Sequence, residues 1–366
     1  MTLKCGIVGL PNVGKSTLFN AVTSSSQADA ANYPFCTIEP NIGRVSVPDE
    51  RLKALAKIAG SSKIIPAQIE FVDIAGLVKG ASKGEGLGNQ FLAHIREVDA
   101  IAYVLRCFEN SDITHVEGDI HPLRDAEIIE TELILADIQS LAKQLPNIEK
   151  KAKQDKELRK QLDLISEILK VLDEGKPARV LLNDENHKEI KMLNLLTSKP
   201  FFYVCNVDEK DIATGNQYTE EVEEYAKEQN TSSIIISAKI EEEIANLEEE
   251  EEKKEFIKDM GIDKSGLEKL IATGYSILGL ITYFTVGPNE THAWTIKEGI
   301  DAQKAAGVIH TDFEKGFICA ETISYKDYIE YKDEVSMKAA GKIRQEGKDY
   351  VVKDGDIILF RFNVTR

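Results

Sequence analysis

The sequence predicts an α/β protein: a mostly parallel sheet with helices on both faces, an inserted pair of antiparallel helices, and a small C-terminal α+β module. The sheet is predicted by short apolar runs that end in polar loops and alternate with amphipathic helical patterns. Ligands of such sheets bind where the strands end, at their carboxyl edge. The expected strands lie at 4–8, 69–72, 100–105, 201–205 and 233–236, and the expected helices between them include 16–23, 51–59 and 89–97.

The alternation of strands and helices is interrupted at residues 124–172. Two stretches there carry Leu and Ile at helical spacing, and the charged stretch Lys150–Lys156 separates them. This pattern predicts two long antiparallel helices whose apolar stripes pack against each other. We place the whole inserted arm at 124–197, and a partner-binding role for its exposed faces stays open.

The pattern changes again near the C-terminus. A helical segment at 261–281 is followed by short strands, which predict an α+β module at 280–366 after a first domain at 1–279. The expected strands of the module are Ile281–Val286, Ala293–Ile296, Phe317–Thr322, Asp349–Val352 and Ile357–Phe362, with short helices or turns at Ala302–Ala306 and Tyr325–Tyr331.

The net charge of −17 is distributed unevenly. Residues 208–259 contain 18 Asp or Glu and six Lys or Arg, so a net charge of −12 falls in this stretch. An acidic surface repels phosphate backbones, which argues against generic nucleic-acid binding, and we expect no DNA partner. A local basic patch can still bind RNA. We expect the glutamate-rich runs Glu241–Glu243 and Glu248–Glu252 to form a solvated helix face or loop.

Cysteine usage and hydropathy favour a cytoplasmic location. The five cysteines are scattered without a C-x-x-C pair, which is typical of reduced thiols rather than a disulfide framework or zinc site. No stretch approaches the ~18 consecutive apolar residues of a membrane span, so no membrane association is expected. The first residues lack the basic and apolar regions of a signal peptide.

A phosphate-binding motif follows the first expected strand. The run Gly9–Thr17 fits G-x-x-x-x-G-K-[ST], the P-loop. Its strand–loop–helix context directs backbone N–H groups and a helix N-terminus at a polyphosphate. We expect Lys15 to reach the β- and γ-phosphates and the Ser16 hydroxyl to hold Mg²⁺. The nucleotide-binding residues predicted here are Asn12, Val13, Gly14, Lys15, Ser16 and Thr17.

Two further segments have the chemistry of nucleotide switches. Asp73 ends an apolar strand, where its carboxylate can join the Mg²⁺ shell, and Gly76 leaves its N–H free for the γ-phosphate. Thr37 lies in a Pro-flanked loop between the first helix and that strand, where switches place a hydroxyl on Mg²⁺. The glycines from Gly76 to Gly88 indicate a second switch loop that can change shape.

The residue after Gly76 is Leu77, where many GTPases carry the Gln that orients the attacking water. Leucine has no hydrogen-bonding group, so either hydrolysis is slow or another group orients the water. The candidates are Asn12 acting through a bound monovalent cation such as K⁺, His94, and His115.

The base-recognition motif is altered. Guanine-specific proteins carry Asn-Lys-x-Asp after the fifth strand, but this chain has Asn206, Val207 and Glu209 at the corresponding places. Losing the bidentate carboxylate removes roughly 1.5–3 kcal/mol of guanine preference, so we expect relaxed selectivity and use of ATP, with weaker binding of GTP. Ser237 and Ala238 occupy the place of the loop that packs on the base.

Together these residues resemble the Obg-like P-loop proteins, and closely the YchF subfamily of Obg-like ATPases. The resemblance covers the whole chain and includes the segments 310–317 and 347–356 of a module like a TGS domain. It implies slow ATP hydrolysis with Mg²⁺, a hydrophobic residue in place of the catalytic Gln, and association with ribosomes, for which we expect the large subunit. TGS modules touch RNA or proteins, but residues 280–366 contain 12 Lys or Arg against 14 Asp or Glu, so their composition shows no basic face.

The resemblance also implies roles for single residues. Ser16 and Thr37 would contact the metal, with Asp73 as the third expected metal-site residue, and Asn206 and Val207 would contact adenine. The nucleotide-binding set further includes Glu209, Ser237 and Ala238, and the catalytic set is Lys15, Thr37, Gly76 and His115.

The resulting hypothesis is a cytoplasmic P-loop ATPase of low intrinsic rate that works as a molecular switch. Two alternatives remain open at this point: a GTPase of the translation-factor class, and a nucleotide-dependent binding scaffold with incidental turnover. A small-molecule kinase ranks last, because the sequence shows no second substrate pocket and no lid arginines.

Overall fold

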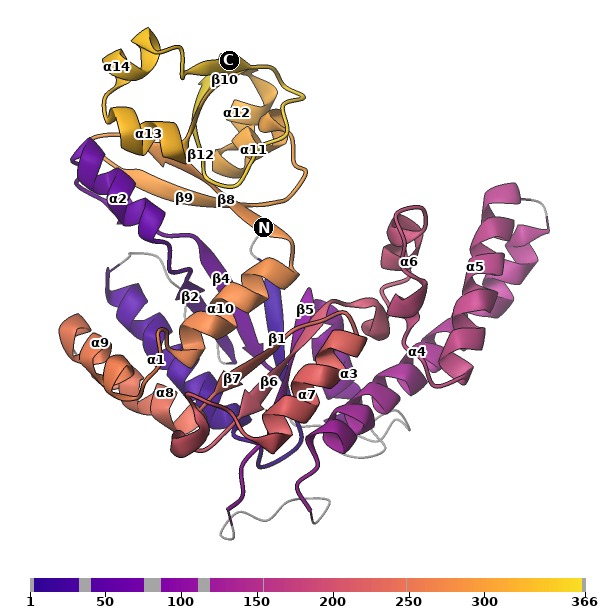
Figure 1. Cartoon of the computed structure of the whole chain (residues 1–366). Helices are drawn as coiled ribbons and strands as arrows, with labels where there is room; N and C mark the ends of the chain where they lie inside the picture. Colours follow the sequence, from indigo (N-terminus) through magenta and orange to yellow (C-terminus); the bar gives the residue numbers. More distant parts are fainter. Residues whose placement is uncertain are drawn as a thin grey trace. The chain divides into compact units, whose positions relative to one another are not determined.

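The computed structural model describes residues 3–32, 41–75, 87–110, 119–153, 155–247 and 249–363. The chain forms two compact units (Figure 1). The large unit consists of Lys4–Gly43 and Phe71–Leu270, and the small unit consists of Met1–Leu3, Arg44–Glu70 and Ile271–Arg366.

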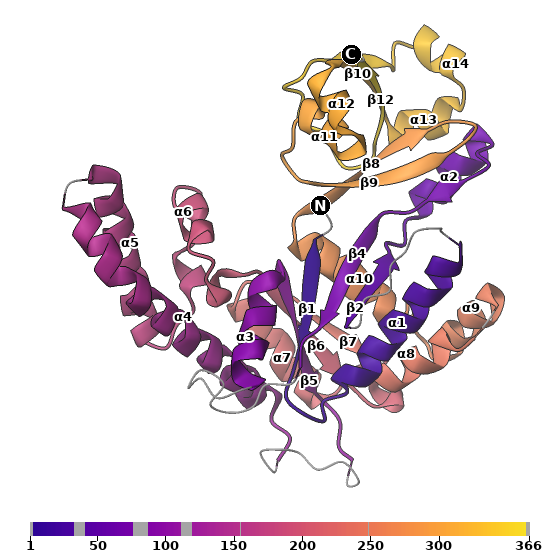
Figure 2. The ribbon, with the colours of Figure 1, turned by 180° about the vertical axis from the view of Figure 1, so that it is seen from behind.

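The strands of the large unit belong to a six-stranded sheet with the order β2-β4-β1-β5-β6-β7, in which β2 and β4 also include residues 44–46 and 68–70 of the small unit. The pairings β1–β5, β5–β6 and β6–β7 are parallel. Helices α1 and α8 lie on one side of this sheet and α3, α4 and α7 on the other (Figures 1 and 2), as expected for an α/β fold. The strands are β1 Lys4–Val8, β2 Ile42–Ser46, β4 Gln68–Asp73, β5 Ala100–Arg106, β6 Phe201–Asn206 and β7 Ser233–Ile236.

Helices of several lengths connect these strands. Every strand predicted for the sheet is present within one or two residues, whereas β2 was not predicted. The helices are α1 Lys15–Asn32, α3 Leu87–Glu97, α4 Pro122–Ala152, α5 Lys156–Asp173, α6 His187–Met192, α7 Gln217–Glu228, α8 Ala238–Ala245, α9 Glu250–Asp259 and α10 Gly266–Ile277, with 3₁₀ turns η2 Ala178–Leu181, η3 Leu196–Ser198 and η4 Glu209–Asp211.

The inserted arm consists of α4, α5 and the short helical turns that follow them (Figure 1). Its apolar stripes pack into a core of their own, as predicted. This packing makes the arm a folded projection of the large unit. The buried members of this core are Ile134, Leu141, Ile165, Ile168, Leu172, Ala178, Ile190, Leu193 and Leu195.

The side chains of Asp137 and Arg179 hold the base of the arm in place through polar contacts. The buried carboxylate of Asp137 on α4 accepts the N–H groups of Leu196 (2.9 Å) and Thr197 (2.8 Å) and the Thr197 hydroxyl (2.7 Å). Burial raises the pKa of Asp137, and these hydrogen bonds oppose that shift. The Arg179 guanidinium pairs with Glu130 at 2.5 Å and lies 4.0 Å from the centre of the Phe201 ring.

The small unit contains a second six-stranded sheet, with the order β11-β10-β12-β8-β9-β3. One apolar cluster forms around Tyr283, Ala305 and Phe360, and a second joins α2 to the sheet through Leu52, Leu55 and Phe284. The elements of this unit are α2 Glu50–Ala59, β3 Ile64–Ile65, β8 Leu280–Val286, β9 Thr291–Lys297, α11 Ala302–Ile309, α12 Thr311–Lys315, β10 Phe317–Ser324, α13 Tyr325–Tyr331, α14 Glu334–Ala339, β11 Arg344–Glu346 and β12 Asp356–Phe362.

The packing of the small unit adds a feature that the predicted division at residue 280 did not contain. Residues 44–70 pack with the C-terminal segment, and β3 pairs in parallel with β9. The cause is the apolar face of α2, which is covered by side chains of β8, β9 and β12. The division into 1–279 and 280–366 itself stays a prediction.

Two details of the prediction were wrong. Asp349–Val352 is not a strand, because only Val351 forms an isolated bridge with Asp301. Two nearby backbone donors bond locally, the Tyr350 N–H to Gly347 O (3.2 Å) and the Lys353 N–H to the Asp356 carboxylate (2.9 Å), while the Val352 N–H donates to Ile300 O (3.1 Å).

The second correction concerns Glu241. It is only 2 % exposed, and its carboxylate accepts the N–H groups of Gly266 (2.7 Å) and Leu267 (2.9 Å) at the start of α10. A buried anion at a helix N-terminus satisfies N–H groups that lack partners within the helix. The remaining run fits the prediction of a solvated helix better, since α9 has no buried residue. No helix in the described part of the chain is long and apolar enough to cross a membrane.

Candidate nucleotide-binding site

The P-loop connects the end of β1 to the start of α1 at Lys15. Gly14 has φ +90°, and a Cβ at this position would lie 2.1 Å from Nδ2 of Asn206. Gly9 is also constrained, because a Cβ there would lie 2.8 Å from the carbonyl oxygen of Val104. The loop therefore needs glycine at both positions to approach β5 and β6 this closely.

Lys15 and Asp73 meet beside the loop. The Lys15 ammonium forms an ion pair with the Asp73 carboxylate, and Lys15 is 9 % exposed. Asp73 is the last residue of β4, and its N–H donates to Asn41 O at 2.9 Å. The two residues that the P-loop and D-x-x-G motifs predicted separately thus lie in direct contact.

The oxygens near this ion pair fit Mg²⁺. Ser16, which follows Lys15, is exposed at the cavity and carries a hydroxyl, and Asp73 carries a carboxylate. In the described parts of the chain no three His, Cys, Asp or Glu residues gather as a metal site. Mg²⁺ is typically held by one or two protein oxygens together with phosphates and water, so this donor set suits a nucleotide-bound magnesium.

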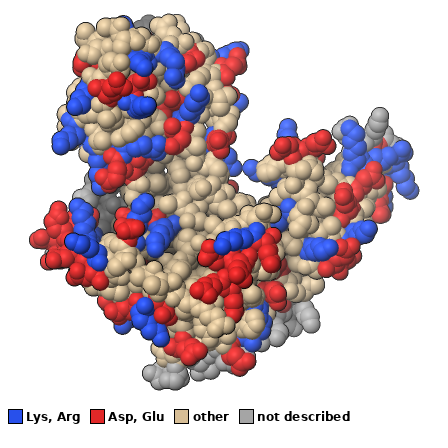
Figure 3. Space-filling model, in the orientation of Figure 1, with Lys and Arg blue, Asp and Glu red and all other residues tan. Residues whose placement is uncertain are grey.

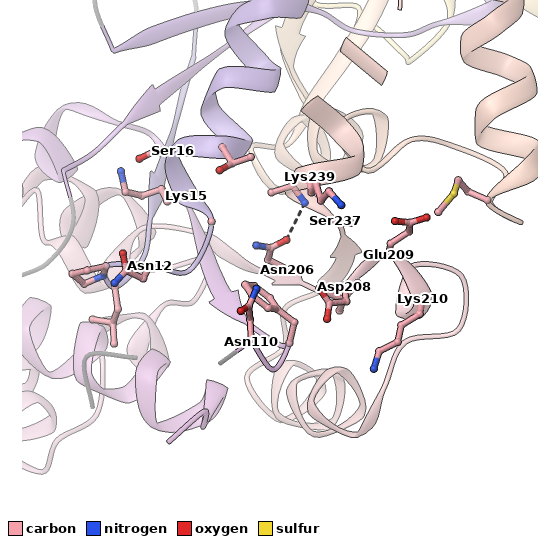
Figure 4. A pocket seen from close by; sticks show the side chains of 18 of the residues that line it. Asn12, Lys15, Ser16, Asn110, Asn206, Asp208, Glu209, Lys210, Ser237 and Lys239 are labelled. Carbon is pink, nitrogen blue, oxygen red and sulfur yellow. Dashed lines mark hydrogen bonds between the residues drawn. The ribbon is translucent and has the colours of Figure 1, made fainter. Parts of the chain in front are cut away.

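Asn206 connects the P-loop to the loop after β7. Its Nδ2 donates to Val13 O at 2.8 Å, and its Oδ1 accepts the Ala238 N–H at 2.9 Å (Figure 4). The side chain is only 5 % exposed. Its amide thus links both walls of the site, and the contact to adenine implied by the resemblance stays a prediction.

The residues after Asn206 form the far end of the cavity. Val207 is 3 % exposed, and its N–H donates to Ile236 O at 2.9 Å. Glu209 and Lys210 are exposed in the 3₁₀ turn η4, and Figure 4 shows the Glu209 carboxylate pointing away from Asn206. This end therefore presents an exposed acidic group and little apolar surface from Val207.

A cavity of about 1250 Å³ runs from the P-loop to this far end (Figure 4). A volume of this size accommodates a nucleotide. The lining residues are Leu10, Pro11, Asn12, Gly14, Lys15, Ser16, Thr17, Phe108, Asn110, Asn206, Val207, Asp208, Glu209, Lys210, Ser237, Ala238, Lys239, Asp259 and Met260.

Five lining residues lie outside the motifs identified in the sequence: Phe108, Asn110, Lys210, Asp259 and Met260. Phe108 and Asn110 closely follow β5, so the rule that ligands bind at carboxyl ends of strands could have found them. Asp259 and Met260 lie at the end of the acidic helix α9, where the sequence carries no such signal.

Arg106 holds the loop after β5. It is 1 % exposed, its Nε donates to Phe108 O at 3.2 Å, and its Nη2 donates to Asn110 O at 3.1 Å. The guanidinium also lies 4.8 Å from the centre of the Phe108 ring. Arg106 thereby positions two residues of the cavity wall without lining the cavity itself.

Two buried thiols lie beside the strand ends. Hydrogen bonding to Cys205 and burial raise the pKa of Cys107 well above its ordinary value. The protonated thiol is a poor nucleophile, so Cys107 serves packing rather than chemistry.

The structure brings together most of the predicted site. Val13 takes part through its carbonyl, and Asp73 takes part through Lys15. Exposed His94 on α3 does not line the cavity. Thr37, Gly76 and His115 lie outside the described residues. The predicted residues that line the cavity are Asn12, Gly14, Lys15, Ser16, Thr17, Asn206, Val207, Glu209, Ser237 and Ala238.

Comparison with known proteins gives matches over the full length. "Ribosome-binding ATPase YchF" of Bacillus subtilis is 52 % identical over 368 residues, covering 100 % of both chains. The protein of the same name from Haemophilus influenzae is 55 % identical over 366 residues, again covering 100 % of both chains. Both relatives far exceed the similarity needed to share a family. The chain belongs to the YchF family of Obg-like ATPases.

The YchF family membership extends to structure. The solved YchF GTPase of Schizosaccharomyces pombe superposes with a TM-score of 0.89 at 42 % identity, covering 98 % of each chain. Residues 4–136 match a family profile described as a 50S ribosome-binding GTPase. Residues 280–363 match the C-terminal YchF profile, described as a protein of unknown function. The predicted fold class, a P-loop domain with a helical insertion and a C-terminal TGS-like module, is therefore confirmed.

Proposed function

We propose that this protein is a ribosome-binding ATPase that works as a slow nucleotide-dependent switch, hydrolysing ATP to ADP and phosphate. The bacterial relatives carry the name ribosome-binding ATPase. The P-loop, the Lys15–Asp73 pair and the cavity supply the phosphate-binding half of such a site. We place the protein in the cytoplasm, where ribosomes are.

The observation that carries the choice of ATP is the far end of the cavity. A guanine filter needs a fixed carboxylate that accepts two N–H groups from the base, but Glu209 is exposed and one methylene longer than the usual Asp. Adenine presents an acceptor at N1 and a donor at N6, so it makes no use of that carboxylate. GTP therefore lacks its usual advantage over ATP, and we propose that it binds more weakly than ATP.

At the phosphate end we assign roles by residue. Lys15 would bind the β- and γ-phosphates, and Ser16 and Asp73 would hold Mg²⁺. When bound, the metal neutralises charge that develops on the phosphates. Asn12 lines the cavity and is the residue through which K⁺ would act. Thr37, Gly76 and His115 keep their proposed parts in metal binding, γ-phosphate contact and catalysis.

The direct test of the site is Lys15→Ala. We expect at least a 100-fold loss of ATPase activity, because the P-loop ammonium is the charge that binds the β- and γ-phosphates. Removal of Mg²⁺ with EDTA should abolish turnover of the wild type. Lys227→Ala, which removes an exposed lysine of α7, is the control and should leave activity unchanged. Unchanged turnover in Lys15→Ala would contradict the site assignment.

A GTPase is the second candidate function. It is favoured by the match of residues 4–136 to a GTPase profile and by the likeness to the Schizosaccharomyces pombe protein, which is named a GTPase. Calorimetric titration with ATP and GTP decides between the two: GTP binding more than tenfold tighter than ATP binding would replace ATP by GTP. A scaffold with incidental turnover would show the same single-turnover rate with and without ribosomes, whereas a switch enzyme is strongly stimulated.

The ribosomal partner is proposed to be the large subunit, in agreement with the 50S description of the matched profile. Sedimentation of the protein with separated subunits tests this assignment. Co-sedimentation with the small subunit alone would contradict it.

A further inference from the structure

The far end of the inserted arm carries a charge opposite to that of the chain. Residues 143–160 contain seven Lys or Arg and three Asp or Glu, a net charge of +4, whereas the whole chain has −17. Residues 122–142, at the base of the arm, contain one Lys or Arg and five Asp or Glu, a net charge of −4. Charge therefore changes sign along the single helix α4. Figure 3 shows Lys and Arg gathered at the end of the arm.

Five of these cations are exposed and make no polar contact with the described part of the chain. None of them forms an ion pair or a side-chain hydrogen bond with another described residue, whereas exposed Lys227 on α7, for example, pairs with Glu223 at 2.7 Å. We call these five residues the arm-tip cations: Lys143, Lys150, Lys151, Lys153 and Arg159.

Helix electrostatics alone does not explain the arm-tip cations. Lys150 and Lys151 lie in the last turn of α4, where the helix dipole favours positive charge. Arg159, however, lies in the first turn of α5, where the dipole favours negative charge, and Lys143 lies more than two turns before the end of α4. The positive charge of Arg159 therefore destabilises the start of α5, and the arm-tip cations make no side-chain contact with described residues that would compensate for it. We take this as an indication that they bind an external anion.

The arm is suited to present these charges at a distance. A helix of 31 residues such as α4 is about 45 Å long. Its base is fixed by the contacts of Asp137 and Arg179, and its apolar core continues toward the tip through Leu145, Ile148 and Leu164. A partner bound at the tip would therefore contact a folded projection of the same unit that holds the nucleotide.

The geometry points to the tip of the arm as an RNA-binding surface, and we propose that the arm-tip cations bind the phosphate backbone of ribosomal RNA. This inference rests on the proposed ribosome binding and names the surface responsible. The described part of the tip offers no aromatic side chain for base stacking. Recognition would consequently depend on backbone charge and shape rather than on base sequence.

The test is the full-length triple variant Lys150→Gln, Lys151→Gln, Lys153→Gln, titrated against purified ribosomes over a range of salt concentrations. We expect at least a tenfold loss of affinity at about 0.1 M salt. The slope of log K against log salt should become shallower by about 2 to 3, since each lost phosphate contact removes about 0.7–0.9. The corresponding triple arginine variant keeps the charge and should bind as the wild type does.

The matched control removes the same net charge from lysines that have carboxylate partners: Lys176→Gln, Lys227→Gln, Lys253→Gln. This control should keep both the affinity and the salt slope. ATP hydrolysis without ribosomes should be unchanged in all variants, because none of these lysines lines the cavity.

The outcomes separate the possibilities. Two results would overturn the arm-tip assignment but not ribosome binding. In the first, the triple glutamine variant binds ribosomes as tightly as the wild type; in the second, the control variant loses as much affinity as the triple variant. Failure of the wild type to bind ribosomes would overturn the proposed function and this inference together. A photo-crosslinker at exposed Asn147 should form adducts with RNA, and adducts only with ribosomal protein would show that the tip binds protein instead.

Discussion

Asn206 shows how one side chain can hold a binding site together. Its amide bonds to Val13 O and to the Ala238 N–H, so the phosphate loop and the base-side loop share one partner. The sequence motif identified Asn206 as a base-motif residue, but motif matching carries no information about which way an amide points. The P-loop motif likewise identified Gly14, but it does not show that Gly14 lies directly against the Asn206 amide.

Gly14→Ala tests this fit. The new methyl group would overlap Nδ2 of Asn206, and alanine is strained at φ +90°. We expect at least a 100-fold loss of ATP affinity in titrations with a fluorescent ATP analogue. Gly60→Ala is the control, since Gly60 has φ +63° with nothing within 4 Å of a new Cβ. It should cost about 1–2 kcal/mol of stability and leave ATP affinity unchanged; an equal loss of affinity in both variants would contradict the steric argument.

At the scale of elements, strand β9 of the β8–β9 hairpin in the small unit carries a stacked pair of aromatic side chains. His292 stacks on Trp294 with ring centres 3.7 Å apart, and the indole Nε1 donates to the Thr285 hydroxyl at 2.9 Å. Burial lowers the pKa of His292, while the neighbouring Glu290 opposes that shift. The folded hairpin therefore favours the neutral imidazole.

The stability of the small unit should depend on pH through His292. Its folded pKa lies below the unfolded value of about 6.5, so the unfolded chain binds more protons in the window just below 6.5. Stability should be complete above pH 6.5 and fall as the pH drops through the folded pKa. Trp294 is the single tryptophan of the chain, so denaturant unfolding followed by its fluorescence reports on this unit.

The variant His292→Gln should lack this part of the pH dependence. The control His310→Gln, which removes an exposed histidine of the same unit, should retain it. An identical pH profile in wild type and His292→Gln would show that the stacked imidazole does not contribute.

Most elements could be predicted from the sequence because their signals are local. The strands of the large sheet and the arm helices have strong apolar periodicity. Two motifs separately identified Lys15 and Asp73 as site residues, and the structure shows that the two form an ion pair. The remainder depends on tertiary contacts that local patterns do not contain. Glu241 reads as part of an acidic run, yet its burial depends on the start of α10, 25 residues further along the chain. Phe108 is held in the cavity wall by a hydrogen bond from Arg106 to its carbonyl oxygen. The apolar periodicity of the sequence does not indicate that Arg106 is buried.

At the scale of the whole molecule, the small unit is assembled from separate parts of the chain. Leu52, Leu55 and Ala67 from the early segment pack with Phe284, Ala293 and Ile357 from the C-terminal segment. Each large apolar side chain buried in this way contributes about 1.5–3 kcal/mol. Losing Leu52 and Leu55 together would thus remove an amount comparable to the stability of a small domain.

A fragment containing only residues 280–363 should consequently fail to fold stably. We expect it to show the solvent-exposed fluorescence of Trp294 and no cooperative unfolding transition. Co-expression with a peptide of residues 44–70 should restore cooperative unfolding and the fluorescence of a shielded Trp294. Cooperative unfolding of the fragment alone would show that α2 and β3 are dispensable for this module.

The early position of α2 in the chain has a consequence for biosynthesis. Leu55 leaves the ribosome more than 200 residues before Phe284, its partner in the same apolar cluster. During that interval the apolar face of α2 lacks its native packing partners, so the nascent chain depends on chaperones or on transient non-native contacts to keep this face from solvent. Folding of the small unit can be completed only after the C-terminal segment has been synthesised and packs against α2.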